Sequence, residues 1–208
     1  SLVPADAVIE VRLDDATMKK TGRHIQGADH YRNGAGTARQ EYRTLWGINL
    51  VWAIMRIPLQ RWPGHHLSLP IGLELYLKAT LAATLKRPYR SRSALARRIV
   101  DHVAATLPPR AIRVATDGGY ATQAFLRALP PNVDVVGRCL LTAKLYQRPP
   151  TRVKGQRGAP RKKGALIGSP KTLATPSSAW HPHPQEAATF IQSWVGIWHS
   201  VFPGRPMR

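Results

Sequence analysis

Near the start of the chain stands Val8-Ile9-Glu10-Val11-Arg12-Leu13-Asp14-Asp15, an apolar, β-branched run that ends in two aspartates. A second run of the same kind is Ala111-Ile112-Arg113-Val114-Ala115-Thr116-Asp117-Gly118-Gly119, in which two glycines follow the aspartate. Runs of β-branched residues that stop at turn residues predict β-strands. If the two strands lie side by side in one sheet, their carboxylates meet at one edge of it.

Paired carboxylates at a sheet edge suit Mg²⁺ or Mn²⁺, because these hard cations take oxygen ligands. A divalent ion held in this way activates a hydroxyl and stabilises a leaving oxygen in phosphodiester chemistry. Aspartate is also common in the turns at strand ends, where it needs no metal. From these two runs alone, both interpretations stay open.

The chain is strongly basic. Its 208 residues include 31 Lys and Arg against 11 Asp and Glu, which gives a formal net charge of +20. A balance of this size predicts a polyanionic partner, with nucleic acid ahead of an anionic membrane. The alternative is a charge that only keeps the chain soluble, and the clustering of the basic residues argues against it. The hydrophobic fraction of 43% is ordinary for a globular core, and the length fits one domain or one domain with an appendage.

Three features of the sequence narrow the class of protein. Cys139 is the single cysteine, which excludes a disulfide framework or a cysteine-rich zinc site within one chain. The longest apolar run, residues 48–55, is too short to span a bilayer, and no secretory signal is recognisable. We therefore expect a cytoplasmic protein without membrane contact.

Hydrophobic periodicity predicts the other elements of the core. A hairpin arm is expected over residues 17–27, a loop over 32–41, and a long strand over 45–59 that is apolar on both faces and hence central. A turn at 60–70 leads to a strand at 71–77. The clearest helix spans residues 91–107, with Ser91 or Ser93 as N-cap, Pro108-Pro109 as the stop, and apolar residues every four positions: Leu95, Ile99, Val103 and Leu107. A short helix at 120–129 and a strand at 133–140 follow.

The predicted order is therefore β-β-β-α-β-α-β, with aspartates on the first and fourth strands. This order defines an α/β chain with a ribonuclease-H-like mixed sheet. The first and fourth strands are neighbours in that fold, so their aspartates would meet.

Beyond this core the composition changes. Residues 148–163 contain no acid and many prolines and glycines, together with Arg148, Arg152, Lys154, Arg157, Arg161, Lys162 and Lys163. Such a segment cannot bury a core, and we expect an extended, mobile arm that contacts a nucleic-acid backbone. The predicted organisation is a core at 1–147, a basic Pro/Gly-rich arm at 148–184 and a short amphipathic tail at 185–208. The candidate DNA contacts are Arg157, Arg161, Lys162 and Lys163 in the arm, with Lys19 and Lys20 after the first strand.

Several blocks carry a family resemblance. They are Asp14-Asp15-Ala16-Thr17-Met18-Lys19-Lys20-Thr21-Gly22, the Gly-x-Asn-x-Val strand in Trp46-Gly47-Ile48-Asn49-Leu50-Val51, the block Asp117-Gly118-Gly119-Tyr120, and the basic segment Gly155–Lys163. Together, from about residue 8 to residue 180, they resemble the DDE superfamily transposases of bacterial insertion sequences. The third block stands where that family has Asp-Ser-Ala-Tyr.

The resemblance implies metal-dependent DNA cleavage at the element end, followed by attack of the freed 3′-hydroxyl on target DNA. Asp15 and Asp117 would ligate Mg²⁺ (or Mn²⁺), with Asp14 as the alternative first ligand. If Ile9, Val11 and Leu13 share one strand face, Asp15 continues that face and Asp14 points away. The implied partner is DNA, as element ends and as target, in the bacterial cytoplasm near the nucleoid. No small-molecule cofactor is implied, and a homodimer is one option for the assembly.

One part of the family pattern is missing. Such enzymes use a third carboxylate, a glutamate in a Tyr-x2-Arg-x3-Glu-x6-Lys helix, whereas the only acids after Asp117 are Asp134 and Glu186, neither in that setting. We therefore expect a C-terminally incomplete transposase, and whether it is an active enzyme stays open. The alternatives are a catalytically inactive DNA-binding remnant and, further off, a basic RNA-binding protein.

Overall fold

The computed structural model describes residues 7–32, 44–59, 61–107, 110–155, 157–174, 180–182, 190–191, 193–198 and 201. The chain divides into two compact units, Ser1–Arg138 and Cys139–Arg208, each of which we describe by itself. Within the described ranges, no helix is long and apolar enough to cross a membrane.

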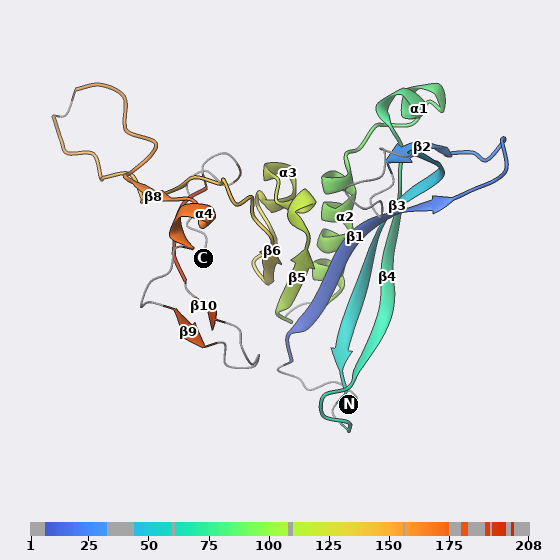
Figure 1. Cartoon of the computed structure of the whole chain (residues 1–208), viewed down its shortest axis with the longest axis horizontal. Helices are drawn as coiled ribbons and strands as arrows, with labels where there is room; N and C mark the ends of the chain where they lie inside the picture. Colours follow the sequence, from blue (N-terminus) through green and yellow to red (C-terminus); the bar gives the residue numbers. More distant parts are fainter. Residues whose placement is uncertain are drawn as a thin grey trace. The chain divides into compact units, whose positions relative to one another are not determined.

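The first unit is built on a six-stranded mixed sheet (Figure 1). Its strands are β1 (Ile9–Lys19), β2 (Asp29–Arg32), β3 (Thr44–Pro58), β4 (His66–Tyr76), β5 (Ile112–Thr116) and β6 (Val133–Gly137). The order across the sheet is β2-β3-β1-β5-β6, and β4 pairs with β3 beyond the stretch that pairs with β2. β1 is antiparallel to β3 and parallel to β5, which is parallel to β6. This mixed α/β sheet is compatible with a ribonuclease-H-like fold.

The core lies between one face of the sheet and helix α2 (Arg92–Thr106). Along β1 the alternation of apolar residues puts Ile9, Val11 and Leu13 inside, each at most 4% exposed. Helix α2 packs against β3 and β4, and Leu95, Ile99 and Val103 of the predicted repeat are buried. Leu107, the fourth member, is the C-cap residue and is partly exposed. Ser91 caps the helix by accepting a hydrogen bond from the backbone N–H of Ala94 at 3.2 Å. The predicted stop at residues 108–109 lies outside the described residues.

The observed order of elements in the first unit differs from the predicted one. Strand β2 and helix α1 (Ala79–Thr84) were not expected, so four strands and two helices precede β5. Helix α1 has no side-chain cap, and its N-cap position is Lys78, so the sequence carries no start signal for it. The predicted hairpin at 17–27 is also wrong, because β1 and β2 do not pair with each other and instead pair with opposite edges of β3.

Two predicted strand boundaries are wrong because they depend on strand pairing, and one predicted helix is shorter than expected. Strand β4 begins at His66 instead of residue 71, because β3 extends far enough to pair with it there. Strand β6 ends at Gly137, where its partner β5 ends. The helix expected over 120–129 is replaced by a 3-10 turn, η1 (Gly118–Tyr120), and the one-turn helix α3 (Gln123–Leu126).

Strand β3 is interior to the sheet, as its apolar character predicts, but its two faces differ. On the inner face Val51 and Ala53 are fully buried. On the outer face Leu50 and Trp52 line an open apolar groove of about 560 Å³ together with Met18 and Leu73. The second apolar face of this strand is therefore partly exposed among the described residues.

The second unit contains β7 (Leu145–Tyr146), β8 (Leu166–Gly168), α4 (Pro170–Leu173), β9 (His181–Pro182) and β10 (Phe190–Ile191). We call residues 148–163 the basic loop. Its ends meet, because Gln147 N–H donates to the carbonyl of Ala165 at 2.9 Å and Gly164 N–H donates to the carbonyl of Gln147 at 3.3 Å. A Cβ atom at Gly164 would lie 2.3 Å from the carbonyl oxygen of Arg148, so this closure requires glycine.

The extended arm expected over these residues is thus a loop closed at its base, which leaves β7 and returns to β8 (Figure 1). Its composition excludes a buried core, but it places no limit on pairing between the flanking residues. The tail predicted at 185–208 lies largely outside the described residues.

Glycine at position 47 permits the close approach of β3 to β1. A Cβ atom there would lie 2.2 Å from the carbonyl oxygen of Met18, which is backbone and cannot rotate away. We expect Gly47→Ala to lower the free energy of unfolding by about 1–3 kcal/mol. Urea denaturation of both proteins measures the difference. Thr44→Ala, at an exposed position of the same strand, is the control and should change the free energy of unfolding little. Equal unfolding midpoints for Gly47→Ala and the parent chain would contradict the requirement for glycine at this position.

Candidate active site

The two strands that carry the aspartates are neighbours in the sheet. The prediction that the first strand ends at Asp14 and Asp15 is wrong, because β1 continues to Lys19 and pairs with β3 along that stretch. β1 and β5 run parallel, and the last paired residues are Arg12 and Ala115. Asp14 and Asp117 each follow two residues further along. Because the strands run in the same direction, Asp117, which directly follows β5, lies beside the part of β1 that carries Asp14 and Asp15. The carboxyl end of a parallel strand such as β5 is where α/β sheets place ligands.

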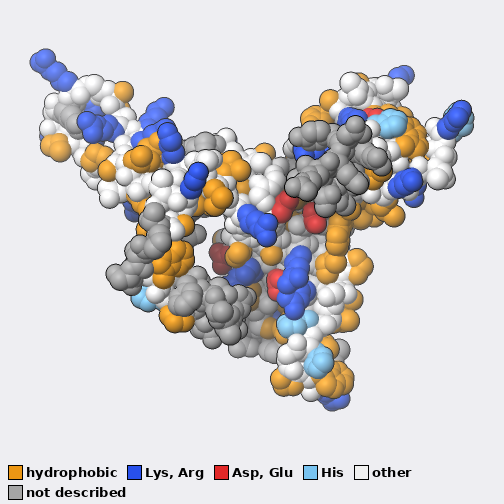
Figure 2. Space-filling view, in the orientation of Figure 1, with side chains coloured by type: hydrophobic (Ala, Val, Ile, Leu, Met, Phe, Trp, Pro, Cys, Tyr) orange, Lys and Arg blue, Asp and Glu red, His pale blue; other side chains and the backbone are white. Residues whose placement is uncertain are grey.

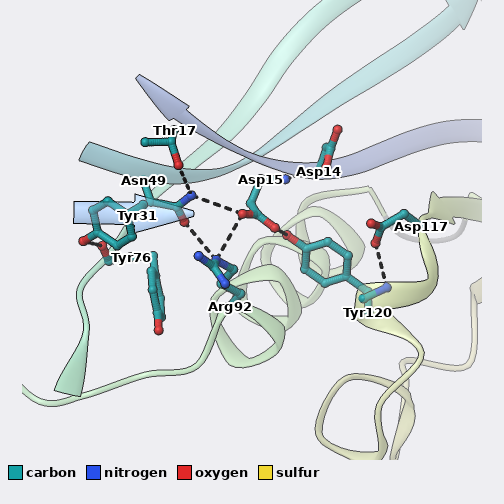
Figure 3. A network of polar contacts seen from close by, with 10 residues as sticks. Asp14, Asp15, Thr17, Tyr31, Asn49, Tyr76, Arg92, Asp117 and Tyr120 are labelled. Atoms are coloured by element: carbon teal, nitrogen blue, oxygen red, sulfur yellow. Dashed lines mark hydrogen bonds and ion pairs between the residues drawn. The ribbon is translucent and has the colours of Figure 1, made fainter. Parts of the chain in front are cut away.

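The two adjacent aspartates point to opposite faces of β1 (Figure 3). Asp15 continues the buried face of Leu13, as strand alternation predicts, and its side chain is 30% exposed. Asp14 is exposed on the other face, and its Oδ1 accepts the backbone N–H of Asp15 at 2.8 Å.

Both carboxylate oxygens of Asp15 have protein partners. Oδ2 accepts a hydrogen bond from Asn49 Nδ2 at 3.1 Å and lies 3.0 Å from Arg92 Nε. Oδ1 accepts a hydrogen bond from the hydroxyl of Tyr120 at 3.3 Å. A carboxylate offers about four lone-pair positions. Oδ2 thus has a hydrogen bond and a counter-charge, and Oδ1 has a hydrogen bond from a neutral hydroxyl.

Asn49 connects this carboxylate to its surroundings. Its side chain is buried, at 1% exposure, and its Nδ2 also donates to Thr17 Oγ1 at 3.1 Å. Its Oδ1 accepts Arg92 Nε at 3.0 Å. The guanidinium of Arg92 in turn lies over the ring of Tyr76, 4.3 Å from its centroid. The amide of Asn49 is thus fully hydrogen-bonded inside the unit, which fixes its orientation and that of Asp15.

Tyr120 links Asp15 to the segment that carries Asp117. Asp117 caps η1 by accepting Gly119 N–H at 2.9 Å, and Tyr120 lies one residue further on, at 2% exposure. Burial raises the pKa of the Tyr120 hydroxyl far above its usual value, and the nearby negative charges, that of Asp15 above all, raise it further. The hydroxyl therefore keeps its proton and remains a donor to Asp15.

The site has two of the carboxylates that a divalent cation needs, but not a full set of protein ligands among the described residues. Within the described ranges, no group of three or more His, Cys, Asp or Glu side chains could hold a metal ion by itself. Mg²⁺, however, commonly binds through one or two carboxylates with water and substrate phosphate as the other ligands. Asp15 on β1 and Asp117 directly after the neighbouring β5 supply two such carboxylates. Glu186 lies outside the described residues.

The charge around the site is unusual for this chain. Asp14, Asp15 and Asp117 gather negative charge, and their charges all act on Tyr120. On the face of the first unit drawn in Figure 2, the few acidic side chains lie among Lys and Arg side chains. An acidic edge in a basic protein favours a bound cation there and a polyanion around it.

The predicted DNA contacts fall in different places. Lys19 is the last residue of β1 and Lys20 follows it, with its N–H donating to the carbonyl of Trp46 at 3.0 Å; both side chains are at the surface of the first unit. The other four, Arg157, Arg161, Lys162 and Lys163, are exposed residues of the basic loop in the second unit.

No role was predicted for Asn49, Arg92 or Tyr120 from the sequence. Signals for Asn49 and Arg92 were present. An asparagine inside an otherwise apolar central strand indicates a buried, hydrogen-bonded amide. An arginine in the first turn of a helix opposes the helix dipole, which suggests that a carboxylate elsewhere compensates it.

Comparison with known proteins identifies the family. Residues 1–194 match the family model described as DDE superfamily endonuclease, so the chain belongs to that family. A DDE endonuclease domain indicates transposase-type nuclease activity, with DNA as the substrate and divalent metal ions as the usual cofactor. No curated protein and no solved structure matches the chain.

Removal of Arg92 should destabilise the first unit. In Arg92→Met the buried Oδ1 of Asn49 loses its donor and Asp15 loses its counter-charge. We expect the free energy of unfolding to fall by about 1–3 kcal/mol, the range for a buried group left unsatisfied.

Arg98→Met is the matched control, because Arg98 lies on the same helix, is half exposed and pairs with Glu74 at 3.6 Å. Loss of this exposed ion pair should lower the free energy of unfolding by at most about 1 kcal/mol. Chemical denaturation measures the free energy of unfolding of both variants. Equal decreases would show that the hydrogen bonds around Asn49 add no more stability than a surface ion pair.

Proposed function

We propose that the first unit is the catalytic unit of an insertion-sequence transposase that cleaves and joins DNA with a divalent metal ion. Asp15 and Asp117 are the proposed metal ligands, and Asp14 is the alternative to Asp15. The observation that carries this proposal is the parallel pairing of β1 with β5, which brings Asp117 beside the aspartates of β1, with Tyr120 reaching from the Asp117 segment to Asp15. Family membership supports the class of reaction.

In this proposal the chain's own residues prepare one carboxylate. Asn49 and Arg92 hold Oδ2 of Asp15, and the proposed metal ion binds at Oδ1, the oxygen that Tyr120 contacts. Tyr120 and Asp117 belong to the same short segment, so Oδ1 faces the segment that carries the second carboxylate. When bound there, Mg²⁺ or Mn²⁺ supplies activation of the attacking hydroxyl and stabilisation of the leaving oxygen.

The two carboxylates should be required for metal binding. We expect Asp15→Asn and Asp117→Asn each to weaken Mn²⁺ binding by at least about tenfold and to abolish nicking of supercoiled DNA. Asp14→Asn should weaken binding less, because its carboxylate points away from Asn49, Arg92 and Tyr120. Asp134→Asn, at an exposed position of β6, is the matched control. Electron paramagnetic resonance of free Mn²⁺ measures binding without requiring activity.

The possible results separate the candidate functions. Unchanged Mn²⁺ affinity in both Asp15→Asn and Asp117→Asn would rule out the proposed site. If Asp14→Asn lowers the Mn²⁺ affinity more than Asp15→Asn does, Asp14 is the first metal ligand in place of Asp15. DNA binding without Mn²⁺ binding or nicking would indicate an inactive DNA-binding protein, and a preference for RNA over DNA would indicate an RNA-binding protein.

The basic loop is the proposed site of contact with the DNA backbone. Replacing Arg157, Arg161, Lys162 and Lys163 by Ala should weaken duplex binding and reduce its salt dependence. Each lost phosphate contact lowers the slope of log K against log salt by about 0.9. Affinities measured over a series of salt concentrations give this slope.

The control replaces Arg87 and Arg90, two exposed arginines between α1 and α2, and should leave the slope nearly unchanged. The change in the slope of log K against log salt is divided by the number of charges removed in each variant. If this value is the same for the loop variant and the control, the basic loop is not a preferred site of contact with the DNA backbone.

A further inference from the structure

A cavity of about 310 Å³ lies in the second unit at the base of the basic loop. Two lysines, Lys144 and Lys163, and two aromatic residues, Tyr146 and Trp198, line it, with aliphatic wall from Leu140 and Ala143. This volume is at the lower end of the range for small-molecule sites, roughly 300–1,000 Å³. The lining combines aromatic and aliphatic side chains with positive charge.

Backbone pairing assembles the cavity from three chain segments. Tyr146 and Ile197 exchange two backbone hydrogen bonds, at 3.0 and 2.8 Å, which places Trp198 beside β7. The bonds of Gln147 to Gly164 and Ala165 bring Lys163, the last residue of the basic loop, to the same place. Trp198 is 5% exposed, so packing holds its ring and leaves only a small part of it open to a ligand. Pairing and packing thus position the aromatic part of the lining before any ligand arrives, whereas Lys144 and Lys163 are exposed side chains.

The positive charge of the cavity has no carboxylate to neutralise it in the described part of this unit. Residues 139–208 contain one acid, Glu186, which is not among the described residues. The described part carries nine basic residues, which are Lys144, Arg148, Arg152, Lys154, Arg157, Arg161, Lys162, Lys163 and Lys171. The ammonium of Lys163 lies 5.0 Å from the centroid of the Tyr146 ring, a cation–π contact that keeps the charge at the cavity.

We propose that this cavity binds one unpaired nucleotide of a DNA strand whose backbone follows the basic loop. An aromatic and aliphatic wall suits the face of a base, and two lysines suit its phosphate. A base inside a duplex has both faces stacked and cannot enter such a cavity, so the nucleotide must be unpaired or extruded. This site is separate from the proposed metal site and does not depend on it.

The test uses the full chain with Asp15→Asn and Asp117→Asn, measured without metal, so that its outcome is independent of the proposed nuclease. Calorimetry compares binding of deoxyadenosine monophosphate with binding of inorganic phosphate. We expect the nucleotide to bind about tenfold more tightly or better, because a stacked base adds to the phosphate contact. Equal affinities would overturn the proposal, since charge alone would then explain the binding.

Variants locate the binding to the cavity. Lys144→Ala and Lys163→Ala remove exposed side chains, so the fold should persist, which circular dichroism verifies. Each should weaken nucleotide binding by about tenfold or more. Lys171→Ala, an exposed lysine of α4 outside the lining, is the matched control and should change it less than about twofold. Equal losses in all three variants, or equally tight binding of an acidic peptide, would contradict a nucleotide site.

Discussion

The buried amide of Asn49 is the interaction on which the organisation of the first unit depends. It joins β1, β3 and α2, because its nitrogen donates to Asp15 and Thr17 while its oxygen accepts Arg92. A buried polar group is stabilising only when it is fully hydrogen-bonded, so every partner has to keep its place. The close approach of β3 to β1 at Gly47, the start of α2 after Ser91 and the rotamer of Asp15 therefore constrain one another.

The sequence predicts the parts of the fold that depend on local pattern. Helix α2 follows from a four-residue apolar repeat with a serine cap, and β1, β3 and β5 follow from apolar runs. It does not predict α1, which has no capping signal, or the ends of β4 and β6, which depend on how far their partners extend. Strand β3 is apolar on both faces, but periodicity does not reveal that its outer face lines an open groove.

In the candidate site, too, local sequence pattern predicts some features, whereas others depend on tertiary contacts. Two apolar runs that stop at aspartate predict neighbouring strands, and alternation along β1 predicts that Asp15 faces inward. They do not predict that β1 continues to Lys19, because that extension depends on pairing with β3. The partners of Asp15 were not predictable, because Arg92 and Tyr120 reach it through tertiary packing. The same limit applies to the basic loop. Its composition predicts an exposed, cationic segment, whereas its closure depends on backbone hydrogen bonds between residues on either side of it.

The contacts of Asp15 also bear on the order of folding. Its hydrogen-bond partners lie 34 and 105 residues away along the chain. Contacts of such separation form only after long loops have closed, which is costly in conformational entropy and slow. The carboxylate therefore acquires its fixed orientation late, once β3, α2 and η1 have docked on β1. A nascent chain that ends before Tyr120 contains Asp14 and Asp15 but lacks the hydroxyl that donates to Asp15 Oδ1. The contacts of this carboxylate are therefore complete only after residue 120 has been synthesised.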